Sequence, residues 1–196
     1  MEDYVQTVQQ MSDMEKINVA PDTVFHSLSH FEKIDDLTRT LLSESGYVMD
    51  AIDSRLAEVG SKFHASFARS PREVLEYVER LSPDVFDRLP EPDKDGRIRI
   101  SVDAGRSVGT DSIIDMSELD RDELQTLRTD VRNDCVIRKV RISRTCLTSE
   151  IQIVLEADGD GYALITIYPG VKAPPLPKDG GSDPFWDRHC FIEHEK

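Results

Sequence analysis

Cysteine is scarce in this sequence of 196 residues, which contains three cysteines and no CxxC pair. An odd and sparse set cannot build a disulfide scaffold and is typical of proteins in a reducing compartment. The sequence also contains no HExxH motif, and its two Asp/Gly-rich stretches lack the full ligand set of a calcium loop. We therefore expect no disulfides, no metal site and no cofactor.

Long apolar runs are absent as well, and no stretch approaches the roughly 20 residues that a transmembrane helix needs. Residues 1–4 are acidic and are not followed by the basic and apolar regions of a signal peptide. The sequence therefore predicts a cytoplasmic protein with no membrane partner.

Positive charge is in short supply, since 24 Lys and Arg stand against 38 Asp and Glu, a formal net charge of −14. Proteins that coat nucleic acid rely on Lys and Arg to release counterions from phosphates, so the acidity argues against that class. Within residues 131–144, however, the only acidic residue is Asp134. The basic residues of this segment are Arg132, Arg138, Lys139, Arg141 and Arg144. One local phosphate site remains compatible with the charge.

The first half of the chain has helical patterning. Apolar residues recur every three or four positions over about 22–60, with a break expected at Gly46. Ser70 followed by Pro71 is a helix start signal, and the Pro-rich segment 89–96 is typical of a linker.

The second half has mainly strand patterning. A strand is predicted at 97–102, a short helix at 117–130, and further strands at 136–142, 150–156 and 162–168. This order predicts an α+β fold in which N-terminal helices are followed by a mainly antiparallel β-sheet. The expected parts are an N-terminal arm (1–21), a helical region (22–88) and an α+β sheet domain (97–196).

Histidines are the first candidates for chemistry. His26 and His30 are one turn apart on the predicted helix, so their rings share a face. Imidazole titrates near neutrality, which suits acid–base work, and a third ligand would turn the pair into a metal site. His189 and His194 are further candidates near the end of the chain, whereas His64 is expected to pack among aromatic residues.

Basic and hydroxyl side chains are the second set. The basic residues of 131–144 would stabilise charge that develops on a phosphodiester, or alternatively protect an edge strand. Thr166 and Tyr168 are predicted to share a strand face with Leu164. Their two hydroxyls would bind a phosphate or orient a nucleophile, or alternatively reflect high strand propensity alone.

Several segments resemble, in order, a group of small bacterial proteins. These segments are Gly109-Thr110-Asp111-Ser112, residues 150–155, Gly161–Gly170 with Lys172-Ala173-Pro174, and Phe185-Trp186-Asp187-Arg188-His189. The group has a "GY-x-LIT-x-x-x-G-x-x-A-P" strand and a closing "FW-x-x-H" motif. It resembles in turn the barnase/EndoU/colicin/RelE-like superfamily of ribonuclease toxins, and the resemblance covers residues 97–192.

The resemblance implies helices before an antiparallel sheet, with a site on the sheet face. In such proteins an early helical histidine, basic residues, a Ser or Thr and a late-strand residue gather there. Carried over to this sequence, it implies these site residues: His26 or His30, Arg141 or Arg144, Thr166, Tyr168 and His189.

The first functional hypothesis is therefore a metal-independent endoribonuclease of toxin type that acts on RNA by acid–base catalysis. His26 or His30 would take the 2′-hydroxyl proton, and His189 would protonate the leaving oxygen. The phosphate would be held by Arg141, Arg144 and Thr166.

The second hypothesis is a non-enzymatic acidic protein, such as an inhibitor, an antitoxin or a nucleic-acid mimic, that binds a basic partner protein. A third is an oligomeric module that associates through the apolar faces of its N-terminal helices. The expected partners are thus RNA or a basic partner protein, together with a cognate inhibitor. The oligomeric state stays open.

Overall fold

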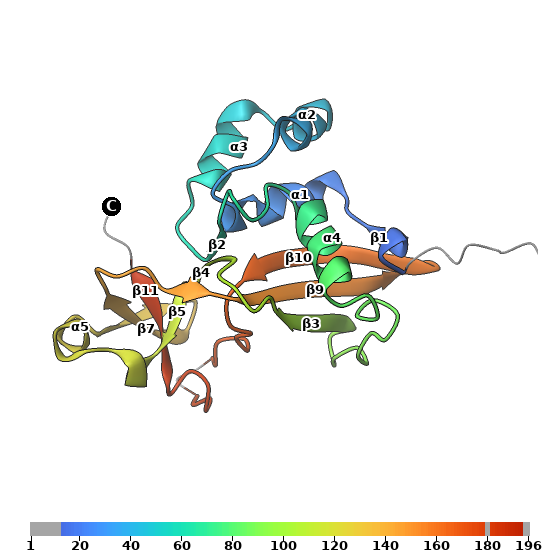
Figure 1. Ribbon diagram of the computed structural model, residues 1–196. Coiled ribbons are helices and arrows are strands. Elements are labelled where there is room, and N and C mark those ends of the chain that lie inside the picture. The colour runs from blue at the N-terminus through green and yellow to red at the C-terminus, as the bar shows by residue number, and fades with distance from the viewer. Residues whose placement is uncertain (1–12, 179–180, 194–196) are drawn as a thin grey trace, which may run out of the picture.

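Helices come first along the chain and sheets follow, as Figure 1 shows for the computed structural model. The structure describes residues 13–178 and 181–193. Within this part of the chain, the strands form three small sheets in which antiparallel pairs predominate. The predicted α+β fold is confirmed.

The elements have the following bounds. The helices are η1 (Asp13–Lys16), α1 (Pro21–Ser27), η2 (Leu28–His30), α2 (Asp36–Glu44), α3 (Met49–Leu56), α4 (Pro71–Leu81), η3 (Met116–Glu118) and α5 (Arg121–Gln125), where η marks a 3-10 helix. The strands are β1 (Ile17–Asn18), β2 (Lys62–Phe63), β3 (Arg97–Asp103), β4 (Gly109–Thr110), β5 (Ile113–Asp115), β6 (Arg128–Arg132), β7 (Cys135–Arg141), β8 (Leu147–Thr148), β9 (Glu150–Asp158), β10 (Gly161–Pro169) and β11 (His189–Glu193).

The N-terminal helical stripe is divided into short helices. α1 stops at Ser27, and the tighter η2 follows at once. α2 begins after Asp35, whose carboxylate accepts the backbone N–H of Thr38 at 2.6 Å. Gly46, at φ +95°, separates α2 from α3, which confirms the predicted break. α4 begins as predicted, because the Ser70 hydroxyl accepts a backbone N–H in the first turn.

The helix predicted over 117–130 is wrong in extent. α5 is shorter and is capped by Asp120, which forms a capping box with Glu123. The chain then enters β6, which forms a hairpin with β7. Asn133 and Asp134 connect the two strands at φ values of 50° and 62°. Positive φ at both central residues is what a type I′ hairpin turn requires, so local turn chemistry overrides the weak helical pattern.

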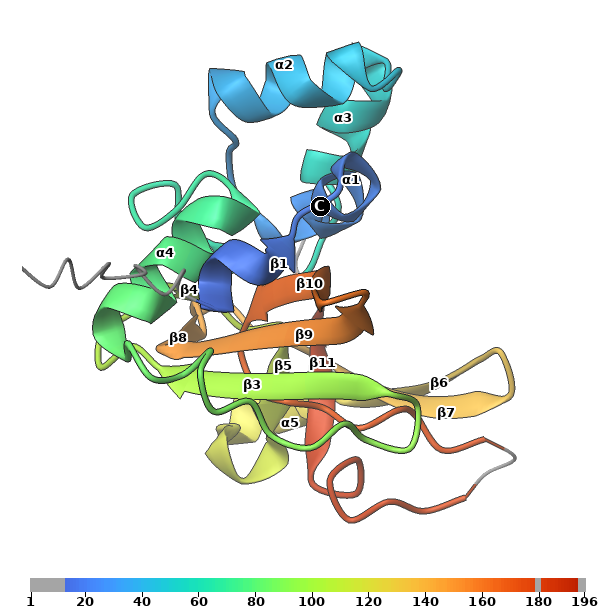
Figure 2. The same ribbon diagram turned by 90° about the vertical axis from the view of Figure 1, so that its right-hand side faces the viewer.

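The strands of the described segments form two sheets of four strands and one sheet of three. The first sheet has the order β1-β10-β9-β3, and the N-terminal helices and α4 lie over one of its faces (Figures 1 and 2). The second sheet has the order β5-β11-β7-β6. The third consists of the short strands β2-β4-β8. β11 contains the last described residues and inserts between β5 and β7, so a late segment becomes a central strand.

Two apolar cores hold these layers together. The larger core joins helical residues such as Leu28 and Phe31 to sheet residues such as Ile153 and Ile167, all fully buried. It therefore runs across the predicted linker 89–96. A smaller core around Val140 lies against the second sheet. Among the described residues, no helix has the length and apolar character needed to cross a bilayer.

Candidate functional site

A β-bulge in β10 decides which of its side chains reach the site. The register with β9 shifts between Leu164 and Thr166, so Ile165 is an extra residue. Leu164 and Ile167 therefore both enter the helix-side core, although they are three positions apart. Thr166 and Tyr168 face the other way. The prediction that Leu164 shares their face is wrong, because strict alternation does not survive a bulge.

Thr166 and Tyr168 line a cavity of about 260 Å³, which we call the His30 cavity. η2 and the segment before β2 contribute one wall, the start of β5 another, and the end of β10 a third. The lining residues are His30, Ser61, Asp111, Ser112, Ile113, Thr166, Tyr168, Pro169, Val171 and Ala173. Three of the predicted site residues therefore come together from distant parts of the sequence.

His30 is held as a neutral imidazole with one nitrogen free. Its Nδ1 lies 3.2 Å from the carbonyl oxygen of Ser61. A carbonyl can only accept, so Nδ1 carries the proton and Nε2 keeps its lone pair. Burial lowers the pKa of His30, and the nearby charges of Arg55 and Lys62 lower it further. Nε2 has no hydrogen-bond partner among the described residues, so it is available as a base.

Tyr168 presents a proton donor beside this base. The centroids of the His30 and Tyr168 rings are 5.5 Å apart. Burial raises the pKa of Tyr168, so its hydroxyl stays protonated at neutral pH. Within the described part of the chain, neither this hydroxyl nor that of Thr166 has a hydrogen-bond partner. A base and two uncommitted hydroxyl donors therefore line one small cavity.

Asp111 fixes the floor of the cavity rather than offering a reactive group. Its two carboxylate oxygens accept the backbone N–H groups of Ile113 at 3.0 Å and Val171 at 2.8 Å. Burial raises the pKa of Asp111, and these hydrogen bonds oppose the rise. Gly170 has φ +111°, and a Cβ there would lie 2.6 Å from the Asp111 carboxyl carbon. Asp111 thus ties the exit of β10 to the entry of β5.

Three of the predicted site residues do not line this cavity. His26 is exposed, because α1 ends one residue after it and the change to η2 breaks the shared face expected at four-residue spacing. Arg144 is bound to Glu123 at 3.0 Å and to the carbonyl of Glu118 at 3.1 Å. Arg141 is exposed at the end of β7, on the second sheet.

His189 also lies outside the His30 cavity. Its Nδ1 is 2.8 Å from the carbonyl oxygen of Phe185, and its ring stacks on that phenyl ring with centroids 3.9 Å apart. Its Nε2 is 4.0 Å from a carboxylate oxygen of Asp115. It lines a separate hollow with Arg138 and Trp186. His194 lies outside the described residues.

Sequence reasoning missed the polar groups that frame the cavity. Ser61 acts through its backbone carbonyl, which no side-chain pattern reveals. Asp111 entered the sequence analysis only as part of the Gly109–Ser112 segment of the resemblance, with no role assigned to it. A turn at Asp111 could have been predicted, because an Asp side chain often accepts the backbone N–H two residues later in an Asx turn, as Asp111 does from Ile113. Across the described residues, no cluster of three or more His, Cys, Asp or Glu is arranged to hold a metal ion.

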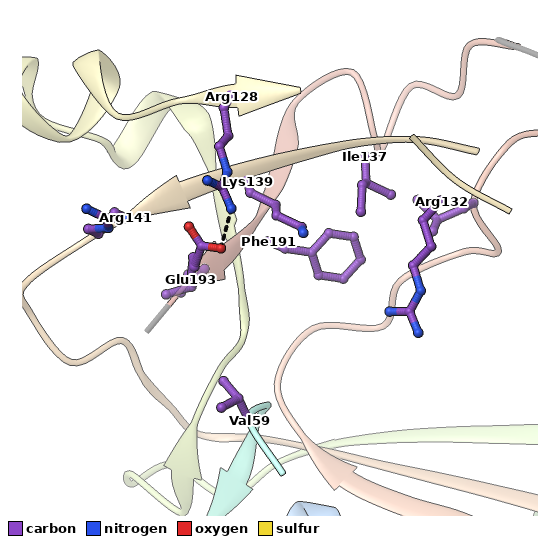
Figure 3. Close-up of a pocket in the computed structure, with 10 residues that line it drawn as sticks. Val59, Arg128, Arg132, Ile137, Lys139, Arg141, Phe191 and Glu193 are labelled. Carbon is purple, nitrogen blue, oxygen red and sulfur yellow. Dashed lines mark hydrogen bonds and ion pairs between the residues drawn. The ribbon is translucent and has the colours of Figure 1, made fainter. Parts of the chain in front are cut away.

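A second and larger hollow, of about 750 Å³, lies over one face of the second sheet, and we call it the basic groove. Figure 3 shows its charged side chains around the ring of Phe191. The lining residues are Val59, Arg128, Arg132, Ile137, Lys139, Arg141, Leu176, Phe191, Ile192 and Glu193. As the alternation predicted, Lys139 and Arg141 share this face, whereas Arg138 lines the hollow on the other side.

No protein-family model matches the chain, and no curated protein matches it in sequence.

Proposed function

We propose that this protein is a metal-independent endoribonuclease whose catalytic centre is the His30 cavity. The observation that carries the proposal is the meeting of His30, Thr166 and Tyr168 in one hollow. A neutral imidazole base with an adjacent proton donor is the equipment that attack of a 2′-hydroxyl on the neighbouring phosphodiester requires. The resemblance to ribonuclease toxins points to the same chemistry.

In the proposed reaction, Nε2 of His30 takes the proton of the ribose 2′-hydroxyl. The 2′-oxygen forms a bond to phosphorus, and the bond from phosphorus to the 5′-oxygen breaks. Tyr168 supplies a proton to the leaving 5′-oxygen, and Thr166 donates a hydrogen bond to a non-bridging oxygen. The products are a 2′,3′-cyclic phosphate and a 5′-hydroxyl, and solvent returns the proton from His30 to Tyr168.

The charge near the cavity supports an anionic substrate. Lys62 lies close enough to lower the pKa of His30, although its ammonium group is bound to the carbonyl of Leu56. In the proposed reaction, the positive charge of Lys62 opposes the nearby charge of Glu58 and stabilises negative charge that develops on the phosphate. The acid role expected for His189 passes to Tyr168 in this proposal, and Arg141 and Arg144 take no part in the bond-making step.

The test is cleavage of an oligonucleotide that carries one ribonucleotide among deoxynucleotides, in buffer with EDTA. The wild type should cut after the ribonucleotide and leave a cyclic phosphate. His30→Ala should slow cleavage by about 10²- to 10⁴-fold, the usual contribution of a general base. His26→Ala is the matched control, because its exposed ring lies outside the cavity. Intact substrate at high protein concentration, or full activity in His30→Ala, would refute the proposal.

One observation favours a second candidate, the acidic interaction protein. α2 and α3 project from the rest of the fold (Figure 1). Leu37 of α2 is 79% exposed and Val48, just before α3, is 67% exposed, and Asp36 and Glu44 of α2 are exposed as well. Apolar side chains within an acidic surface suit a basic partner protein. Immobilised wild type should then retain a basic protein that Leu37→Ser does not, and retention unaffected by that change would count against this candidate.

A further inference from the structure

We propose that the basic groove binds single-stranded RNA and leads it into the His30 cavity. This inference rests on the proposed function and extends it from the reacting phosphate to the neighbouring nucleotides. The features that support it are uncommitted cations, a supported aromatic ring, and the direct adjacency of the two hollows.

The charges on the groove face favour an anion. Arg128 pairs with Glu193, and Lys139 pairs with Asp130 at 2.7 Å. Arg132 and Arg141, by contrast, are exposed and have no side-chain partner among the described residues. The guanidinium groups of Arg132 and Arg141 are therefore available to bind an anion. Guanidinium groups match the geometry of phosphate oxygens.

Phe191 supplies a stacking surface in the same groove. Its ring stacks on Trp186 with centroids 5.0 Å apart and an interplanar angle of 27°. Trp186 is itself anchored, since its indole N–H donates to the carbonyl of Pro174 at 3.0 Å. A ring that is already fixed loses little entropy when a base stacks on it. Cations beside an aromatic platform are the combination by which proteins bind single strands with little sequence preference.

The groove and the His30 cavity adjoin along more than one segment. Ile113 lines the cavity, and its register partner across the β5–β11 ladder is Phe191, which lines the groove. Paired residues on adjacent strands are about 5 Å apart. Ser61 and Val59, two positions apart, likewise line the cavity and the groove. In the proposed binding mode, a strand stacked on Phe191 runs on from the groove toward the His30 cavity.

The acidity of the whole chain does not prevent this binding. At 0.1 M salt the Debye length is about 10 Å, so charges on distant surfaces are largely screened. The local balance of the groove then decides the attraction. Duplex RNA would present its bases already paired and stacked, so the fixed ring of Phe191 favours a single strand.

The test uses a fluorescent 12-nucleotide RNA with 2′-O-methyl groups throughout, which the proposed reaction cannot cleave. Anisotropy titrations between 50 and 200 mM NaCl give the affinity and its salt dependence. The double variant Arg132→Gln/Arg141→Gln should make the negative slope of log K against log salt shallower by about 1.4, which is two phosphate contacts at about 0.7 each. If the two proteins bind equally at 1 M salt, this difference in slope means that the affinity of the double variant at 0.1 M salt should be about 25-fold lower than that of the wild type. Arg72→Gln/Arg80→Gln is the matched control, because these exposed arginines of α4 line neither hollow.

A second variant separates stacking from charge. Phe191→Leu keeps an apolar side chain, and should weaken binding at least about 5-fold with the salt slope unchanged. Equal affinity in the wild type and the groove variants would overturn the inference, as would tighter binding of duplex RNA or of polyglutamate. The proposed function fails separately: it falls if unmodified RNA is not cut, whereas the titration with the uncleavable strand still reports on the groove.

Discussion

Replacing Gly170 by alanine should disrupt the junction that holds the His30 cavity open. Gly170 has φ +111°, where an L side chain is strained, and a new Cβ would lie 2.6 Å from atoms of the Asp111 carboxyl group. Backbone hydrogen bonds at residues 170 and 171 hold this turn in place. The carboxyl group must therefore move, and in moving it releases the backbone N–H of Val171.

The magnitude follows from two contributions. The left-handed backbone costs a non-glycine residue about 1–2 kcal/mol. A buried N–H left without its acceptor costs about 1–3 kcal/mol. Gly170→Ala should therefore lower the free energy of unfolding by about 2–5 kcal/mol, a large share of the 5–15 kcal/mol typical of a domain.

Urea unfolding measures this loss, and Gly46→Ala is the matched control. Gly46 also has a positive φ, +95°, but a Cβ there meets no heavy atom within 4 Å. It should lose only the backbone contribution of about 1–2 kcal/mol. In an Asp111→Ala background, Gly170→Ala should cost no more than the control, since the clash has been removed. Equal losses for Gly170→Ala and Gly46→Ala, or strict additivity with Asp111→Ala, would refute the reasoning.

Two further predictions concern titrating groups. Because burial lowers the pKa of His30 below 6.5, the unfolded state binds its proton at a higher pH than the native state does, so the free energy of unfolding should fall as pH drops below about 6.5, by up to about 1.4 kcal/mol per pH unit. Urea titrations at pH 7.5 and 5.5 should show a smaller pH difference for His30→Gln, and an unchanged difference would contradict the assignment. Burial raises the pKa of the Cys190 thiol to about 11, so at pH 8 iodoacetamide should label the partly exposed Cys146 before Cys190. Mass spectrometry of labelled peptides measures the order, and faster labelling of Cys190 would be inconsistent with its burial.

Helix starts and short strands could be predicted where a few neighbouring residues determine them. Ser70 and Pro71 begin α4 because their own chemistry satisfies its first turn. The helix predicted over 117–130 failed because its apolar spacing was weak, while the turn at Asn133 and Asp134 stabilised a hairpin. β11 was not predicted, since its hydrogen-bond partners on β5 and β7 come from earlier, separate parts of the chain.

The sequence predicted which kinds of residue form the candidate site, but not which of the candidates lie in the same cavity. His26 and His30 are equivalent in a continuous helix, and only the end of α1 at Ser27 separates them. Arg141 and Arg144 were predicted to assist the same centre as Thr166, but they lie on the second sheet and its following loop. Spacing along one element constrains which side chains share a face, whereas it says nothing about which elements meet.

The sequence by itself determined the local features of this protein: its acidity, the basic segment 131–144, the order of helices before strands, and the alternation that gives Lys139 and Arg141 a common face. These depend on neighbouring residues and on fixed helical and strand periods. Only the tertiary structure decided that η2, β5 and the bulged end of β10 enclose one cavity, and that the basic groove lies beside it. Those arrangements depend on long-range packing and on a register shift, because burying the apolar faces of distant segments selects which polar side chains are brought together.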